Sequence, residues 1–186
     1  MNDFIINNCS NSLNDNFSNS VLKSSNSFKF HTNQNYYNKT PLVNLVSLSD
    51  HLGLKNIFVK DESNRFGLNS FKVLGSTYAI HEILKNNPNI KVFCTATDGN
   101  HGKGLAWAAQ KFSKKAIVFV PRDTSKNRIK AIQLYDAIVY QLDLNYEETC
   151  VYASKKCDEN GWQLVQDASW ENYEEIPSLI MSGYLT

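Results

Sequence analysis

Lys72 stands at a place in the chain where an amine could do chemistry. It follows the loop DESNRFGLNS and opens an apolar segment between Phe71 and Val73, with no acidic residue beside it in the sequence. Apolar surroundings disfavour the charged form of an amine, and the N-terminus of a helix adds partial positive charge that acts in the same direction. Lys72 is therefore a candidate for covalent Schiff-base chemistry. The alternative is a surface lysine whose stem packs while its ammonium reaches water.

A second candidate is the loop ATDGNHGKG, at residues 96–104, which precedes an apolar helical segment. Its glycines are expected to let the backbone approach a ligand closely, and bare N–H groups at a helix start can bind an anion. The loop matches neither GxxxxGK[ST] nor GxGxxG, the two common nucleotide-binding patterns. The alternative interpretation is that Asp98 and Asn100 simply cap the helix. The three glycines are Gly99, Gly102 and Gly104.

Two further residues are candidates because of their positions. His101 has no second histidine or cysteine at a metal-ligand spacing, so a packing or orienting role is favoured over a metal site. Asp167 directly follows the short apolar run WQLVQ. A carboxylate at the carboxyl end of a strand in a parallel sheet points into the crevice where ligands bind. A plain turn aspartate is the alternative.

The elements that must position these residues alternate between strand-like and helix-like segments. This alternation predicts an α/β fold, a parallel sheet with crossover helices. Both candidate loops and Asp167 would then lie at the carboxyl edge of the strands. An extended start and a short helix ending at Gly53 are expected within 40–53. Further strands are expected at 56–61, 91–97, 115–121, 137–142 and 162–166, and helices at 70–85, 103–113, 124–135, 145–160 and from 173 onward.

Composition excludes several classes of protein. The 186 residues suffice for one domain with a core, and the net charge of +1, without a basic run, argues against a nucleic-acid partner. No apolar run approaches the ~20 residues that cross a bilayer, and the N-terminus lacks a secretory signal. The four cysteines form no CxxC pair and no zinc spacing. A reduced, cytoplasmic location is expected.

Three segments, in this order, resemble the pyridoxal-phosphate enzymes of fold type II, the group that includes tryptophan synthase β. They are LNSFK, TDGNHG and VQDASWENYEEIP. The aspartate before GNHG, together with GLAWAAQKF and DLNYEET, is most similar to the diaminopropionate ammonia-lyase family. The resemblance extends from about Pro41 to the last residue.

This resemblance implies pyridoxal 5'-phosphate as cofactor and a small amino acid as substrate. Lys72 would hold the cofactor's aldehyde, and Asn100 would hydrogen-bond its ring hydroxyl oxygen. Asp98 would take the α-proton from the D-isomer of 2,3-diaminopropionate. Asp167 would take it from the L-isomer, with part of that work open to Lys72. The reaction would be a β-elimination that yields pyruvate and ammonia.

The sequence departs from the family because it contains no glycine-rich loop for the cofactor phosphate after Gly104; the later glycines are Gly161 and Gly183. The chain thus looks like the N-terminal half of such an enzyme, with a homodimer expected only for the completed protein. Such a half should expose apolar surface. Two alternatives stay open: a serine or threonine dehydratase-like enzyme, and an inactive truncated pseudoenzyme.

The same resemblance divides the chain into four parts. A polar N-terminal arm at 1–38, loosely attached and with short helices, is followed by the first part of the large domain at 39–92. A small α/β domain is expected at 93–167, and residues 168–186 would begin the return to the large domain.

Overall fold

The computed structural model describes residues 26–186, and its centre is a parallel sheet with the strand order β5–β4–β3–β6. This confirms the predicted α/β class. In register, Cys94 pairs with Ile117 on one side and with Leu164 on the other. The strands are β3 (Val92–Ala96), β4 (Lys115–Val120), β5 (Ile138–Gln141) and β6 (Gln163–Leu164).

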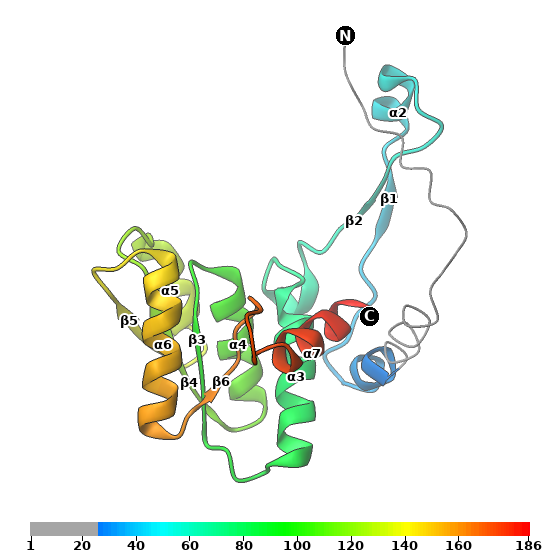
Figure 1. The fold of residues 1–186 in the computed structure, drawn as a ribbon. Coiled ribbons are helices and arrows are strands. Elements are labelled where there is room, and N and C mark those ends of the chain that lie inside the picture. Colours follow the sequence, from blue (N-terminus) through cyan, green and yellow to red (C-terminus); the bar gives the residue numbers. More distant parts are fainter. Residues whose placement is uncertain (1–25) are drawn as a thin grey trace.

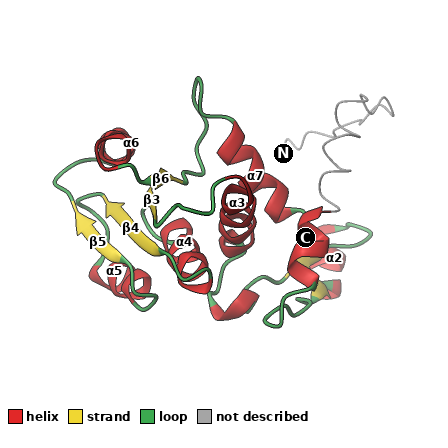
Figure 2. Ribbon diagram, turned by 90° about the horizontal axis from the view of Figure 1, so that it is seen from below, coloured by secondary structure: helices red, strands yellow, loops and turns green. Residues whose placement is uncertain are grey.

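Helices cover both faces of this sheet. Figure 2 shows α6 (Tyr146–Asn160) on one face, and α4 (Asn100–Lys111) and α5 (Lys126–Gln133) on the other. The alternation of side chains along β4 explains how the sheet serves two cores. Val118 and Val120 pack in the cluster with α4, whereas Ile117 and Phe119 pack in the cluster with α6. The continuous apolar run in the sequence therefore reflects burial on two faces.

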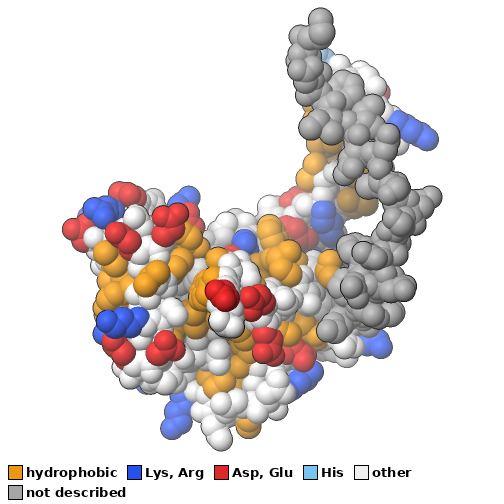
Figure 3. Space-filling view, in the orientation of Figure 1, with side chains coloured by type: hydrophobic (Ala, Val, Ile, Leu, Met, Phe, Trp, Pro, Cys, Tyr) orange, Lys and Arg blue, Asp and Glu red, His pale blue; other side chains and the backbone are white. Residues whose placement is uncertain are grey.

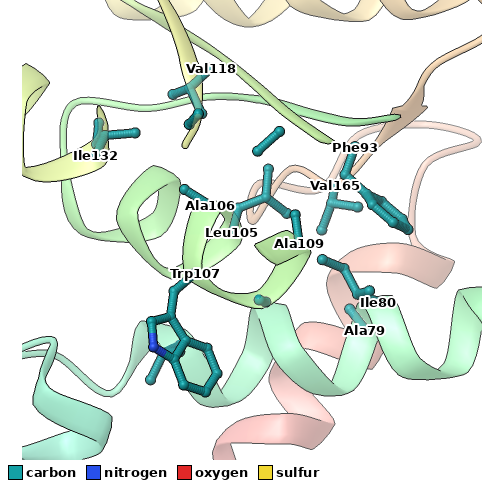
Figure 4. Packing of buried hydrophobic residues seen from close by; sticks show 14 of the residues in the cluster. Ala79, Ile80, Phe93, Leu105, Ala106, Trp107, Ala109, Val118, Ile132 and Val165 are labelled. Atoms are coloured by element: carbon teal, nitrogen blue, oxygen red, sulfur yellow. The ribbon is translucent and has the colours of Figure 1, made fainter. Parts of the chain in front are cut away.

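The helix α3 (Lys72–Asn86) lies between α4 and α7 (Glu175–Tyr184), at the side of the sheet (Figure 1). Figure 4 shows side chains of α3, among them Ala79 and Ile80, in one core with Leu105 and Ala109 of α4 and with Phe93 and Val165. This core crosses the predicted domain boundary at 92–93. The division into domains stays a prediction.

Part of the predicted N-terminal arm is firmly packed. Residues 26–32 are helical, and the fully buried His31 places its Nε2 atom 3.1 Å from the carbonyl oxygen of Leu74 in α3. Burial lowers the pKa of His31 to about 4, so the ring is neutral at pH 7. The expectation of a loose attachment is therefore wrong for residues 26–32. Residues 1–25 of the predicted arm lie outside the described residues.

A buried arginine anchors the following segment. Arg65, in the short 3-10 helix η1 (Arg65–Gly67), is 1% exposed. Its guanidinium donates to both carboxylate oxygens of Glu62, at 2.7 and 2.9 Å, and to the carbonyl of Asn38 at 2.9 Å. Paired geometry of this kind satisfies a buried charge. It ties the chain before the first strand to the loop that leads to Lys72.

The first two strands form a separate antiparallel pair that projects from the body (Figure 1). They are β1 (Leu42–Asn44) and β2 (Phe58–Lys60), joined through α2 (Val46–Leu52), which ends at Gly53 with φ 65° as expected. The strand expected at 56–61 exists, but it does not join the parallel sheet, which corrects that part of the prediction.

This projecting unit carries exposed apolar side chains, as expected for a chain that resembles half of an enzyme. Leu42 is 65% exposed, Val46 is 56% exposed and Phe58 is 55% exposed. Figure 3 shows hydrophobic side chains along the projection where the grey atoms leave it visible. Among residues 26–186, none of the helices combines the length and apolar character required to span a bilayer.

We predict that Gly183→Ala destabilises the chain. A Cβ at Gly183 would lie 2.7 Å from the carbonyl oxygen of Leu74 and 2.8 Å from the Cα of Gly75, so α7 and α3 would have to separate. Such overpacking costs about 1–3 kcal/mol, even though alanine favours a helix. Urea unfolding followed by circular dichroism measures the loss. Met181→Ala, on an exposed position of the same helix, is the control and should change stability by less than about 0.5 kcal/mol. An unchanged midpoint for Gly183→Ala would contradict the close contact.

Candidate active site

A cavity of about 350 Å³ opens at the carboxyl edge of the sheet. Thr97 and Asp98 follow β3, Asp167 follows β6, and Lys72 begins α3. The crossover from β3 runs through α4 to β4 on one side, whereas β6 lies on the other side of β3. Ligands of open α/β sheets bind where the strand order reverses in this way. The predicted site residues therefore come together in one cavity. They are Lys72, Asp98, Asn100 and Asp167.

An ion pair between Lys72 and Asp167 joins the start of α3 to the segment that follows β6. Lys72 Nζ donates to Asp167 Oδ2 at 2.8 Å, and the side chains are 31% and 15% exposed. The ammonium also lies 5.7 Å and 5.5 Å from the ring centroids of Phe71 and Tyr184. The sequence predicted an amine enclosed by apolar groups. Instead, the amine has an aromatic side, a solvent-facing side and a carboxylate partner from 95 residues further along the chain.

Burial raises the pKa of the Asp167 carboxyl, but the pKa still falls below its ordinary value because neighbouring positive charge outweighs burial. A protonated His101 would make the larger contribution to this lowering, and the hydrogen-bonded Lys72 ammonium makes the next. Burial lowers the pKa of His101, so this ring is neutral at pH 7 and the ammonium is the charge present there. Asp167 is consequently a carboxylate, ready to accept a proton.

The start of α4 is capped by a residue that the sequence did not single out. The hydroxyl oxygen of Thr97 accepts hydrogen bonds from the backbone N–H groups of Gly99, at 3.0 Å, and Gly102, at 3.2 Å. The capping role considered for Asp98 and Asn100 therefore belongs to Thr97. Both of these side chains are left facing the cavity.

Asp98 differs from Asp167 in its surroundings. Its side chain is 70% exposed, and Arg128 Nη1 lies 3.6 Å from its Oδ2 atom and 3.2 Å from its carbonyl oxygen. Arg128 is itself 59% exposed, so this pair is screened by solvent and contributes little to stability. Arg128 thus connects α5 loosely to the loop that carries Asp98.

The glycines of this loop serve packing more than ligand access, which corrects the prediction for two of them. A Cβ at Gly102 would lie 2.3 Å from Thr97 Cγ2, and one at Gly104 would lie 3.1 Å from the backbone nitrogen of Val73. Gly104 therefore lets α4 approach the first turn of α3 and sets the position of Lys72. At Gly99 the nearest atom would be 3.5 Å away, in the Arg128 side chain, which is an ordinary contact.

His101 is buried behind Asp167. Its Nε2 atom lies 2.8 Å from the carbonyl oxygen of Val165, and its Nδ1 atom lies 3.7 Å from Asp167 Oδ2. This arrangement agrees with the orienting role expected for His101. No cluster of metal-ligating side chains occurs in the described part of the chain.

Gln166 is the functional residue that sequence analysis missed. It is 1% exposed, and its Oε1 accepts from the N–H of Ala96 at 2.9 Å and from the hydroxyl of Thr95 at 2.8 Å. Since Oε1 is held as an acceptor, Nε2 donates to the hydroxyl oxygen of Tyr146 at 3.2 Å. Gln166 thereby fixes both Asp167, its neighbour, and Tyr146 at the cavity. The available signal was a glutamine at the end of the apolar run WQLVQ, directly before Asp167.

The donor set fits one end of the cofactor implied by the resemblance. The cavity combines a lysine amine with the carboxamide of Asn100, which has no hydrogen-bond partner among residues 26–186 and is free to bind a ligand oxygen. Lys103 also lines the cavity, but its ammonium donates to the carbonyl of Leu68. The sequence offers no glycine-rich backbone for a phosphate group. The residues present therefore fit the aldehyde and ring hydroxyl of pyridoxal phosphate.

Comparison with known proteins agrees with this chemistry. A family model described as pyridoxal-phosphate dependent enzyme matches residues 34–185. The diaminopropionate ammonia-lyase of Salmonella typhimurium is 44% identical over 178 residues, covering 84% of this chain. The enzyme of that name from Escherichia coli is 39% identical over 175 residues, covering 85% of this chain. The chain spans about 44% of the length of either relative.

Solved structures give the same result. The Escherichia coli diaminopropionate ammonia-lyase in complex with an aminoacrylate-PLP azomethine reaction intermediate superimposes with a TM-score of 0.85 at 39% identity. The match covers 88% of this chain and 45% of that one. A threonine deaminase from Solanum lycopersicum, with a TM-score of 0.76 at 22% identity, shares the fold.

We predict that Gln166→Ala destabilises the chain by about 1–3 kcal/mol, because it leaves the buried N–H of Ala96 without its acceptor. Urea unfolding measures the effect. Gln163→Ala is the matched control: this glutamine is partly exposed and its amide donates only to the neighbouring carbonyl of Leu164, so its loss should cost less than about 0.5 kcal/mol. Equal losses in the two variants would show that the Gln166 network does not hold the site.

Proposed function

Because the chain belongs to the family of pyridoxal-phosphate dependent enzymes, we propose that it carries the lysine-bearing part of a lyase site for 2,3-diaminopropionate. The observation that carries this proposal is the cavity that Lys72 shares with two carboxylates from different strand ends, Asp98 and Asp167. The reaction would consume one substrate molecule and one water, and would release pyruvate and two molecules of ammonia. The similarity to the Salmonella typhimurium and Escherichia coli enzymes supports this substrate.

Two residues would hold the cofactor. Lys72 would bind pyridoxal 5'-phosphate through its amine, and Asn100 would donate to the ring hydroxyl oxygen. When bound, the cofactor supplies an electron sink for the negative charge that develops at the substrate Cα.

The carboxylates would accept the α-proton. Asp167 Oδ2 would take it from the L-isomer, and its distance of 2.8 Å to Lys72 Nζ lets the two groups share that proton. Asp98 would take the proton from the D-isomer. Protons on opposite faces of one carbon require bases in different positions, and these two aspartates follow different strands, β3 and β6.

Two other functions are weighed against this one. A serine or threonine dehydratase-like activity is the first, and a threonine dehydratase of Staphylococcus aureus is 29% identical over 130 residues. Asp98, a charged residue where such enzymes have a small hydroxyl residue, favours diaminopropionate. The second is cofactor binding without turnover. A homodimer of the completed protein and a cytoplasmic location belong to the same proposal.

We expect pyridoxal phosphate to label Lys72. The purified chain is mixed with the cofactor, its absorbance is followed, and the adduct is reduced with borohydride and mapped by peptide mass spectrometry. Lys72→Ala should abolish the label. Lys103→Ala, which removes a second lysine of the same cavity, is the matched control and should retain it. Label on Lys103, or no specific label, would overturn the cofactor assignment. Label without product formation from diaminopropionate would support binding without turnover.

We expect Asp98→Asn and Asp167→Asn to separate the two enantiomers. Each variant should lose about 10²–10⁴-fold in kcat on one isomer, D for Asp98 and L for Asp167, because a positioned base contributes this much. Ammonia and pyruvate release are measured for each isomer in a preparation that turns over. Equal losses on both isomers in both variants would contradict the assignment of one base to each face.

A further inference from the structure

His101 occupies a buried position between a carbonyl oxygen and a carboxylate. Its side chain is 4% exposed, and Nε2 lies 2.8 Å from the oxygen of Val165. Nδ1 has no hydrogen-bond partner among residues 26–186, although Asp167 Oδ2 lies only 3.7 Å away. An unsatisfied buried nitrogen carries a cost, so its position needs a reason.

The hydrogen bond to Val165 determines where the ring proton lies. A carbonyl oxygen can only accept, so Nε2 carries the proton. Burial lowers the pKa of His101, so the ring holds no second proton at pH 7. The lone pair of Nδ1 therefore faces the Asp167 carboxylate. Two acceptors that face each other repel, but a single proton on Oδ2 would turn the contact into a hydrogen bond.

We infer that His101 is a positioning residue whose Nδ1 accepts a hydrogen bond from Asp167 once this carboxyl group has taken up a proton. The inference rests on the proposed role of Asp167 as a base. In that step the substrate Cα–H bond breaks and an O–H bond forms at Oδ2, while the imidazole stays neutral. The gap of 3.7 Å must close by roughly 1 Å to reach hydrogen-bond distance. His101 would thus make Asp167 a stronger base than its ion pair alone allows.

The other groups near Asp167 do not provide this acceptor. The Lys72 ammonium donates to Oδ2 and favours the carboxylate. The hydroxyls of Tyr146, Tyr173 and Tyr184 keep their protons at pH 7, since burial raises the pKa of each, and no hydrogen bond joins any of them to Asp167 among residues 26–186. The Cys150 thiol also has a raised pKa through burial. Asp98 is the remaining carboxylate of the cavity, and it lies beside Arg128.

His31 offers a natural comparison within the same chain. It is also buried, its Nε2 lies 3.1 Å from a backbone carbonyl oxygen, and its Nδ1 has no partner within the described range. No ion pair with a carboxylate is present at His31 among the described residues. The two histidines therefore share tautomer and burial and differ in the carboxylate.

The test is a titration of the chain without cofactor or substrate. Aspartate side chains are labelled with ¹³C and histidine rings with ¹⁵N, and Asp167 is assigned from Asp167→Asn. NMR spectra are recorded from about pH 8 to about pH 1.5, because the pKa of Asp167 lies below its ordinary value and is expected to fall further in one variant. Four proteins are compared: wild type, His101→Gln, His101→Asn and His31→Gln. Gln places an amide donor near the Nε2 position without an acceptor at Nδ1, whereas Asn places an amide oxygen near the Nδ1 position.

We expect the pair to take up its first proton on Asp167, with the ¹⁵N signal of His101 Nδ1 moving at the same pH. The signal of His31 Nδ1 should follow only the protonation of its own ring, whose pKa is about 4. In His101→Gln the pKa of Asp167 should fall by roughly one unit, because the protonated form loses its acceptor. It should stay near the wild-type value in His101→Asn and in His31→Gln. In an active preparation, His101→Gln should lower kcat for the L-isomer more than for the D-isomer, with KM little changed.

Two results would overturn the inference: first protonation on His101 instead of Asp167, or a pKa of Asp167 that is unchanged or higher in His101→Gln. The wild-type titration decides the first point even if the variant does not fold. Since the titration needs no cofactor, its outcome is independent of whether Lys72 binds pyridoxal phosphate. If pyridoxal phosphate fails to label Lys72, the proposed function is wrong, but the measured proton affinity of Asp167 and His101 remains valid.

Discussion

The site depends on the close packing of α3 against the helices on either side of it. Gly104 lets the backbone of α4 approach the first turn of α3, and Gly75 and Gly183 let α7 approach the same helix further along. At each of these positions a Cβ would enter the backbone or side chains of the neighbour. Protein interiors transmit such constraints because they are close-packed. Lys72 is therefore positioned by glycines that do not line the cavity.

The second constraint is polar and runs along the end of β6. This strand contains only Gln163 and Leu164, too few residues to fix its own direction, yet it delivers Asp167 to the cavity. Gln166 supplies the missing rigidity by bonding the backbone of β3 and the hydroxyl of Tyr146. The Lys72 ion pair then secures the carboxylate from the other side. Packing positions the amine, and hydrogen bonds position the acid.

The sequence was informative where local pattern determines structure. Alternating strands and helices predicted the sheet. The carboxyl ends of parallel strands lie at one edge, which correctly predicted that Asp98 and Asp167 come together there. Prediction from the sequence failed where a residue's contact partner lies far away in the chain. The sequence near Lys72 does not indicate Asp167 as its partner, and the sequence near Gly104 does not indicate its contact with the backbone of Val73. The capping role of Thr97 was missed because Asp98 and Asn100, both better N-cap residues, stand close to it. The strand at β2 had the correct type, but its pairing with β1 was not encoded in its own composition.

The contrast between the two aspartates suggests how one cavity could serve opposite faces of a substrate carbon. Asp167 is 15% exposed, and its proton affinity is set by a lysine and a histidine held in place by the core. Asp98 is 70% exposed beside an exposed arginine, where water screens the interaction. A substrate enclosed over Asp98 would displace that water and strengthen its interactions, because electrostatic energies grow as the surroundings become less polar. The electrostatic surroundings of Asp167 are thus set by the folded chain, whereas those of Asp98 would be set when a ligand binds.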